Sequence, residues 1–134
     1  MENKEMILKV LNEYLMNRFK YKAPPADFGL SKSTIYGRRK RVTLHLRMIR
    51  SGGGLWDVGT FVLAQIGFQE ERKGHGTDFL RFLTENLPAE FTHIGIESVN
   101  DESRSFGIKH GFKPHKSNTD YIIAISDLKK RFQE

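Results

Sequence analysis

A short segment of glycines and cations is the part of the sequence best suited to bind an anion. Residues 71–76 read Glu-Arg-Lys-Gly-His-Gly and connect an apolar run, residues 61–68, to an amphipathic run, residues 77–87. The first N–H groups of a helix lack intrahelical partners, and glycine lets a ligand approach them closely. The start of a helix at this point therefore suits a phosphate or diphosphate group.

Neighbouring side chains strengthen this anion site. Arg72 and Lys73 add positive charge where the helix dipole already favours an anion. Gly74 and Gly76 free the backbone, and Thr77 could either cap the helix or donate its hydroxyl to the ligand. The GxGxxG pattern of dinucleotide-binding domains and the GK[ST] pattern of Walker loops are both absent. A simple tight turn is the alternative interpretation of these glycines.

His75 lies between the two glycines. We expect it to be a solvent-exposed loop residue whose backbone N–H, rather than its imidazole, serves the site.

The hydrophobic pattern predicts a mixed α/β domain around this segment. An alternating run at 42–49 and a longer run at 55–68 predict an antiparallel hairpin. Gly111 is a candidate left-handed cap after a short helix. The remaining elements are predicted as a helix at 3–19, a mostly irregular loop at 20–37, a flexible connection at 51–54, a helix at 77–87, a strand at 93–99, a short helix at 103–110, a strand at 121–125 and a charged tail at 127–134.

Length and composition predict a single domain, residues 1–134, with a core of its own. The chain has no cysteine, so disulfides and thiolate metal sites are excluded, and we predict no metal site. No run approaches the roughly 20 apolar residues of a membrane span, and the N-terminus does not resemble a signal peptide. We therefore expect a cytoplasmic protein. The net charge of +6 favours anionic partners in a general way.

The glycine segment resembles motif A of the GNAT family of acetyl-CoA-dependent acyltransferases. That motif reads [QR]-x-x-G-x-[GA] between a strand and a helix, and Gly74 and Gly76 fit its glycine positions. Glu71 occupies the first position in place of Gln or Arg, which is a departure from the pattern.

A second segment is similar to motif B of the same family, which runs strand, Asn, short helix and Gly-Phe. Here Asn100 follows a predicted strand, Phe106 takes the apolar helix position, and Gly111-Phe112 closes the helix. The resemblance covers about residues 42–125. It implies a mixed, mostly antiparallel sheet with helices on both faces and a splay between the central strands.

The resemblance also implies acetyl-CoA as cosubstrate. By family analogy, the main chain of Ile66 and Phe68 would contact the pantetheine amides, and residues 72–77 would wrap the pyrophosphate. Asn100 would reach the pantetheine arm near the thioester, and Phe106 would pack on that arm. Plain core packing is the alternative for Ile66, Phe68 and Phe106, and a helix cap is the alternative for Asn100.

The positions that often carry the family's catalytic base and acid hold other residues. Thr60 replaces the glutamate of the strand, and Gly107 replaces the tyrosine of the motif B helix. Asp57 and His45 are candidate bases, although Asp57 could be a surface turn residue and His45 a sheet-surface residue. Water alone could also suffice, or transfer could be inefficient. The oxyanion donor would be a backbone N–H near Ile66.

A basic run precedes the first hairpin strand. It could follow a nucleic-acid backbone or receive an acidic protein, with Tyr21 and Tyr36 available to stack on bases. A solvated strand entrance that discourages edge aggregation is the alternative. The run consists of Arg38, Arg39, Lys40 and Arg41.

Two functions follow from these features. The first is transfer of an acetyl group from acetyl-CoA to a primary amine in a ternary complex. The second is a weakly active or inactive GNAT-fold module that binds nucleic acid or a protein partner. The sequence does not identify the acceptor, and association as a homodimer is one way its site could be completed.

Overall fold

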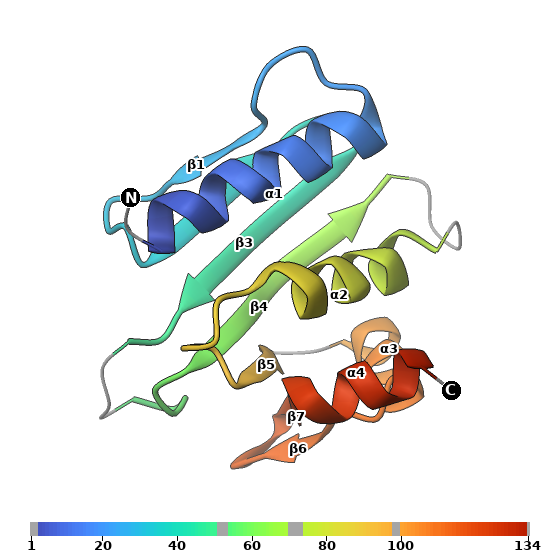
Figure 1. Cartoon of the computed structure of the whole chain (residues 1–134). Coiled ribbons are helices and arrows are strands. Elements are labelled where there is room, and N and C mark those ends of the chain that lie inside the picture. The colour runs from blue at the N-terminus through green and yellow to red at the C-terminus, as the bar shows by residue number, and fades with distance from the viewer. Residues whose placement is uncertain (1–2, 51–53, 70–73, 98–99, 134) are drawn as a thin grey trace.

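The computed structural model describes residues 3–50, 54–69, 74–97 and 100–133 (Figure 1). Helices and strands alternate along these residues, with a run of four strands near the N-terminus. Their order is α1 (Asn3–Phe19), β1 (Ala26–Phe28), β2 (Thr34–Arg38), β3 (Val42–Met48), β4 (Thr60–Phe68), α2 (His75–Asn86), β5 (His93–Ile96), α3 (Asp101–Lys109), β6 (Lys113–His115), β7 (Ser117–Ala124) and α4 (Ile125–Gln133).

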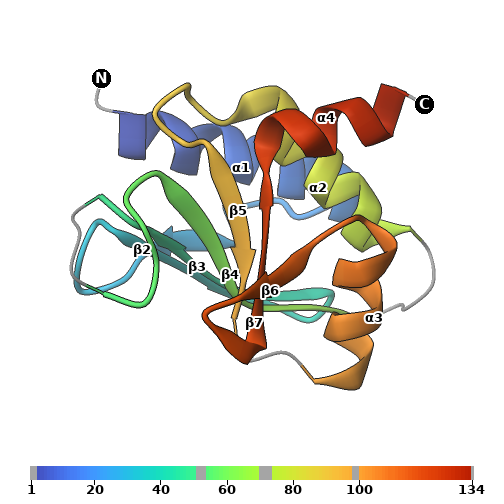
Figure 2. The same ribbon diagram turned by 90° about the horizontal axis from the view of Figure 1, so that it is seen from below.

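The strands form one sheet in the order β1-β2-β3-β4-β5-β7-β6. Each neighbouring pair is antiparallel except β4 and β5, which are parallel and joined through α2. Helices α1, α2 and α4 lie on one side of the sheet, and α3 lies on the other (Figure 2). The predicted mixed, mostly antiparallel sheet with helices on both faces is confirmed.

Buried and half-buried residues alternate along β3, and this alternation shows which face of the sheet packs against the core. Val42, Leu44, Leu46 and Met48 are buried and pack in the core with side chains of α1 and α2, such as Leu11, Leu15, Phe79, Leu80 and Leu83. The intervening residues Thr43, His45 and Arg47 are half-buried on the opposite face, called the outer face below. The half-buried strand and the helix predicted for residues 3–19 are therefore confirmed.

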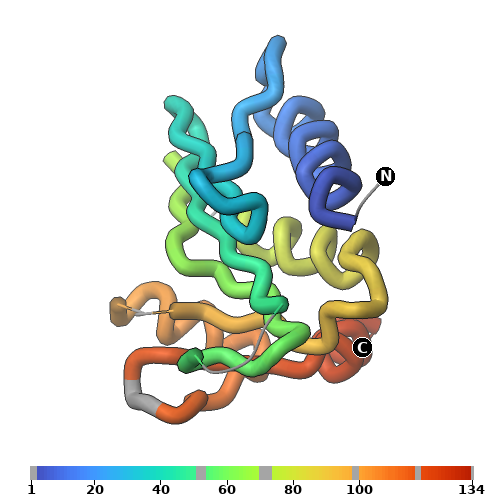
Figure 3. Tube along the Cα trace, turned by 90° about the vertical axis from the view of Figure 1, so that its left-hand side faces the viewer, coloured from blue at the N-terminus to red at the C-terminus, as the bar shows by residue number. Residues whose placement is uncertain are grey.

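The central strands separate toward the end of β4. Among the described residues, only Thr60–Leu63 of β4 pair with β5, while β4 itself continues to Phe68. A register shift at His45/Leu46 places Gln65 opposite His45 and Leu63 opposite Leu46, so Ala64 is an extra residue in β4. Such a bulge bends a strand, and here it coincides with the point where β4 leaves β5. The predicted splay is confirmed (Figure 3).

The segment predicted as an irregular loop, residues 20–37, instead contains β1 and most of β2. Its prolines, glycine and serines favoured a loop, but contacts distant in sequence hold it extended. The buried amide of Asn12 donates to the carbonyl of Ala26 (3.0 Å) and accepts from its N–H (2.9 Å). Ile35 is fully buried and lies opposite Leu46 of β3.

The strand predicted for residues 55–68 begins only at Thr60. Residues 54–59 form bends and a turn that ends at Gly59, whose φ of 89° favours glycine. Residues 51–53 of the predicted connection lie outside the described residues. The helix predicted for 77–87 begins earlier, at His75, and the described part of the strand predicted for 93–99 ends at Ile96.

The C-terminal residues predicted as a charged tail form helix α4. Ile125 and Leu128 are buried at helical spacing, and Phe132 continues the same stripe against the core. The surrounding lysines, arginine and acids obscured this stripe in the sequence. Gly111 has a φ of 89°, as expected for a left-handed position after α3, and leads into the unpredicted strand β6.

Candidate functional site

The glycine segment forms the N-terminus of α2. Gly74 is the N-cap with φ 77° and ψ 12°, and no side chain caps the helix there. The N–H of Asp78 donates to the carbonyl of Gly74 at 2.9 Å, so the regular helical pattern starts at this glycine. Arg72 and Lys73, which were predicted to add charge, lie outside the described residues. An uncapped helix start is available to an anion at this point.

A cleft of about 680 Å³ opens beside this helix start. One wall is the splayed end of β4, another is the first turn of α2, and the third is α3. The cleft brings together seven of the predicted cofactor-binding residues. They are Ile66, Phe68, Gly74, His75, Gly76, Thr77 and Phe106, and the α3 residues Asp101, Glu102, Ser103, Ser105 and Lys109 complete the lining.

Phe106 packs directly on Gly76. A Cβ atom at Gly76 would lie 2.9 Å from Cε1 of Phe106, closer than real Cβ contacts come. The ring also meets the imidazole of His110 edge-on, with centroids 4.8 Å apart. Because Phe106 is half-buried, it both supports the core and presents a ring to the cleft.

Thr77 does not cap α2, which corrects one of its two predicted roles. Its hydroxyl lies 3.0 Å from Nε2 of His110, the residue after α3. His110 is buried, and burial lowers its pKa, with further lowering by Lys109 and Arg131. The hydroxyl of Thr77 therefore links the two helices that form the walls of the cleft.

His75 is not the exposed loop residue predicted from the sequence. It is the first residue of α2, and its ring lies 4.9 Å from Phe19 and 5.4 Å from Phe68, centroid to centroid. Its Nδ1 atom accepts a hydrogen bond from Nε of Arg18 at 3.0 Å. The imidazole thus joins the end of α1 to the cleft.

A second contact ties α1 to the same helix start. Arg18 forms a salt bridge with Asp78 at 3.0 Å, and the hydroxyl of Tyr14 donates to the same carboxylate at 2.6 Å. Burial, followed by the bond to Asp78, raises the pKa of Tyr14 well above its ordinary value. These partners are about 60 residues apart in sequence, and no local pattern could have indicated them.

Asn100 is the N-cap of α3. Its side-chain oxygen accepts a hydrogen bond from the N–H of Ser103 at 2.9 Å, and the residue is exposed. Asn100 is not among the residues that line the cleft. The geometry matches the helix-cap alternative, and a contact with the pantetheine arm stays a prediction.

The two predicted bases lie in different surroundings. His45 lies on the outer face beside the bulge in β4, stacked on Tyr36 with ring centroids 4.2 Å apart. Its Nε2 atom is buried and has no hydrogen-bond partner within the described part of the chain. Burial and then Arg47 lower the pKa of His45, and the opposing effect of Glu97 is smaller. The imidazole is therefore neutral at pH 7.

Asp57 is not on the strand where it was predicted. It is an exposed residue of the turn before β4 and lies 3.4 Å from Nζ of Lys116. The cleft uses Ile66 and Phe68 at the other end of β4, and the six residue-to-residue steps from Thr60 to Ile66 span roughly 20 Å. Asp57 is thus remote from the cleft.

The two positions that lack the family's usual catalytic groups are buried. Thr60 is 1% exposed and lies opposite His93 of β5. A Cβ at Gly107 would be in ordinary contact with Ile96 and Phe112, both at 3.5 Å.

Glu97 is a charged residue of this region that sequence reasoning missed. It follows β5 directly, and its N–H donates to the carbonyl of Leu63 at 3.2 Å, where the strands begin to separate. Its Oε2 atom accepts from Nη1 of Arg47 (2.5 Å) and from Nε1 of Trp56 (2.8 Å). These contacts span 50 and 41 residues, so the sequence carried no signal for them.

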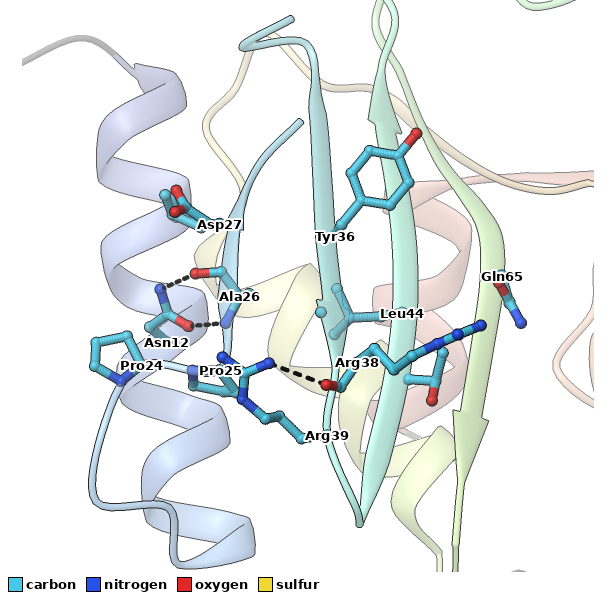
Figure 4. A pocket seen from close by; sticks show the side chains of 13 residues that line it. Asn12, Pro24, Pro25, Ala26, Asp27, Tyr36, Arg38, Arg39, Leu44 and Gln65 are labelled. Atoms are coloured by element: carbon cyan, nitrogen blue, oxygen red, sulfur yellow. Dashed lines mark hydrogen bonds between the residues drawn. The ribbon is translucent and has the colours of Figure 1, made fainter. Parts of the chain in front are cut away.

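A second cavity of about 740 Å³ lies across β1, β2 and β3 and reaches Gln65 of β4 (Figure 4). Tyr36, Arg38, Arg39, Thr43 and Gln65 line it together with Asp27, Leu44 and residues around Asn12 and Pro25. The predicted basic run is divided, because Lys40 is exposed elsewhere and Arg41 bonds to the carbonyl of Phe19.

None of the helices in the described residues has the length and apolarity needed to cross a membrane. No group of three or more acidic or histidine side chains among them is arranged to hold a metal ion.

Comparison with known proteins shows similarity in structure only. No protein-family model and no curated protein sequence matches the chain. Its structure is similar to that of a point mutant of the AtaT toxin bound to the C-terminus of the antitoxin AtaR and acetyl-CoA. The identity is 10%, the match covers 75% of this chain and 71% of the toxin chain, and the TM-score is 0.56.

A second similar structure is the KacTA–DNA complex, at 10% identity. The match covers 93% of this chain and 85% of the chain in that complex, and the TM-score is 0.52. Both likenesses are to GNAT-fold toxins, and they confirm the GNAT-like fold predicted from the two sequence motifs.

Proposed function

We propose that the chain is an N-acetyltransferase that moves the acetyl group of acetyl-CoA to a primary amine in a ternary complex. The cleft between the splayed end of β4, the glycine start of α2 and α3 is the observation that supports this most strongly. It combines a strand end that pairs with β3 but has no described partner on its β5 side with a helix N-terminus that lacks a side-chain cap. The AtaT toxin, which shares the fold, was solved with acetyl-CoA.

In this proposal each wall of the cleft holds a different part of the cofactor. The diphosphate accepts hydrogen bonds from the first turn of α2 around Gly74 and Gly76. The pantetheine arm lies along β4 at Ile66 and Phe68, and the ring of Phe106 packs against it. The thioester then reaches the inner end of the cleft, where β4 and β5 separate after Leu63.

Transfer at that point needs a neutral amine, an oxyanion donor and a path for one proton. The amine nitrogen attacks the acetyl carbon, the N–C bond forms as the C–S bond breaks, and the sulfur leaves as the CoA thiolate. We assign the surplus proton of the amine to Nε2 of His45, directly or through water, because that neutral nitrogen has no partner among the described residues. A backbone N–H near Ile66 would stabilise the oxyanion.

A melting curve with and without acetyl-CoA tests the cofactor assignment, with CoA and ATP as comparison ligands. A ligand at 100 times its dissociation constant should add about 2.7 kcal/mol to the free energy of unfolding. That raises the melting temperature by several degrees for a chain of this size. We expect the melting temperature to rise with acetyl-CoA and with CoA but not with ATP. If neither acetyl-CoA nor CoA raises the melting temperature, the proposal is wrong.

A second candidate function is binding of nucleic acid, without efficient transfer. It is supported by the cavity that Arg38 and Arg39 share with Tyr36, since cations beside an exposed aromatic ring suit an unpaired base and its phosphates. The KacTA–DNA complex shows a similar fold in a complex with DNA. Affinity for single-stranded RNA or DNA should fall steeply with salt and should be lost in the Arg38→Ala/Arg39→Ala double variant.

Absence of that salt-dependent affinity, or its persistence in the double variant, would exclude this second function. A protein partner and a homodimer stay predictions, and analytical ultracentrifugation of the purified chain tests the homodimer directly.

A further inference from the structure

The carboxylate of Glu97 lies where the two central strands part. Leu63 is the last β4 residue in register with β5, and the N–H of Glu97 donates to its carbonyl. Along β5, Ile94 and Ile96 belong to the core, so Gly95 and Glu97 point to the outer face. Glu97 is therefore the first side chain of the outer face beyond the paired part of β5.

The two oxygens of this carboxylate are used differently. Oε2 holds both donors, Nη1 of Arg47 and Nε1 of Trp56. Oε1 accepts no hydrogen bond from any described residue, although the side chain is only 21% exposed. A carboxylate oxygen has two acceptor positions, so a structural role for Glu97 accounts for Oε2 and leaves Oε1 unexplained.

The neighbours of Glu97 fix its direction. Trp56 is buried, and a Cβ at Gly95 would collide with its indole, so the ring lies flat on β5. The other face of the indole stacks on His115 with centroids 4.8 Å apart. This packing holds Nε1 of Trp56, and through it Oε2, so Oε1 is the end of a held group that no described residue engages.

A second aromatic pair borders the same region on the β3 side. His45 stacks on Tyr36, and the charges of Arg47 and Glu97 both act on its imidazole. Nε2 of His45 and Oε1 of Glu97, which both lack a hydrogen-bond partner among the described residues, thus belong to one outer-face group beside the strand split.

We infer that Glu97 binds the acceptor, with Oε1 accepting a hydrogen bond from a primary amine that arrives as an ammonium ion on an alkyl arm. This inference rests on the proposed function, because that proposal brings the thioester to the point where β4 and β5 separate. Glu97 lies at this point and is not itself part of the cleft lining. Glu97 orients the amine nitrogen. The ammonium ion first loses one proton to water and becomes the neutral nucleophile, and the second proton, released as the amide forms, passes to His45. Arg47 and Trp56 position the carboxylate and do not touch the substrate.

The chain contains a single tryptophan, so Trp56 is a built-in reporter of this site. The experiment titrates the full chain with n-butylammonium chloride and follows the emission of Trp56. Parallel titrations use potassium chloride at equal ionic strength and n-butanol at equal concentration. We expect a saturable change with n-butylammonium alone, and a dissociation constant at least tenfold higher in Glu97→Gln.

Glutamine keeps an oxygen that can accept from Arg47 and Trp56, so Glu97→Gln should retain the wild-type melting temperature within a few degrees. Glu90→Gln is the control, since Glu90 also pairs with an arginine, Arg50, at 2.6 Å, and its side chain is 36% exposed compared with 21% for Glu97. Glu90→Gln should leave the titration unchanged.

The inference is overturned if n-butylammonium gives no saturable change in the wild type, or if Glu97→Gln binds it as the wild type does. An equal loss in Glu90→Gln would also overturn it, because the effect would then be one of general charge. The titration needs no acetyl-CoA. If n-butylammonium does not bind as expected but acetyl-CoA still raises the melting temperature, only the role inferred for Glu97 is rejected. If acetyl-CoA does not raise the melting temperature, the proposed function is rejected.

Discussion

The hydroxyl of Thr77 and Nε2 of His110 lie 3.0 Å apart and join the start of α2 to the end of α3. The two helices form facing walls of the cleft, and Phe106 lies between them against Gly76. The same imidazole is buried next to two cations, Lys109 and Arg131. The contact between the two walls therefore runs through a histidine whose pKa is lowered by burial.

Stability should consequently decrease as the pH falls below neutrality. The pKa of His110 and that of His45 are both lowered in the folded chain, each mainly by burial. Between those lowered values and the unfolded value of about 6.5, the unfolded chain binds more protons. The free energy of unfolding should thus fall as the pH drops from about 7 through this window. Urea unfolding at several pH values measures it.

A His45→Gln/His110→Gln double variant distinguishes the contribution of these two histidines to the pH dependence of stability from that of the carboxylates. Its stability should change less between pH 7 and pH 5 than that of the wild type. Equal slopes in the two proteins would show that neither histidine is responsible.

Gly76→Ala should narrow the cleft. The new Cβ would meet Phe106 at 2.9 Å, and crowding of this kind costs about 1–3 kcal/mol. The melting temperature should fall, and the shift produced by acetyl-CoA should shrink because the ring moves into the cofactor path. Thermal unfolding with and without acetyl-CoA measures both effects.

Gly67→Ala is the control for that substitution, because a Cβ at Gly67 meets nothing within 4 Å. Adding Phe106→Leu to Gly76→Ala should restore part of the lost stability. A Gly76→Ala protein with wild-type stability and an unchanged acetyl-CoA shift would contradict the packing argument.

Asn100→Ala should lower stability by about 1 kcal/mol, the usual cost of losing a side-chain cap. The bond from the N–H of Ser103 to the Asn100 oxygen disappears, while the residues that line the cleft remain. We therefore expect little change in acetyl-CoA affinity, and Asn100→Asp should keep the cap. A calorimetric titration that shows strongly weakened acetyl-CoA binding in Asn100→Ala would instead support the family-like contact with the pantetheine arm.

Local sequence patterns were sufficient to predict those elements of the fold that depend on residues close together in the sequence. The alternation of residues 42–48 and the apolar stripe of α2 identified their elements directly. The strands β1 and β2 were missed because their extended form depends on Asn12 and on pairing with β3, neither of which is visible in residues 20–37. In α4, charged residues concealed an apolar stripe of only three residues.

In the candidate site, too, some groups could be predicted from the sequence and others could not. The glycine start of α2 is contiguous in sequence, so its chemistry could be recognised before its geometry. The contacts of His110 and Glu97 join residues 33 and 50 positions away, and those of His75 reach back to α1. Such groups acquire their roles only when the sheet and helices assemble.

Tyr14→Phe should destabilise the chain by about 1.5–3 kcal/mol, as expected for loss of a hydrogen bond to a charged group. The hydroxyl of Tyr14 donates to Asp78 at 2.6 Å, and phenylalanine keeps the stacking on Phe82, whose centroid lies 4.3 Å away. Arg18 still pairs with Asp78, so the helix start should stay in place. Urea unfolding of Tyr14→Phe, Asp78→Asn and the double variant measures the coupling between the two groups. Strict additivity of the two single effects would show that the hydroxyl and the carboxylate do not stabilise one another.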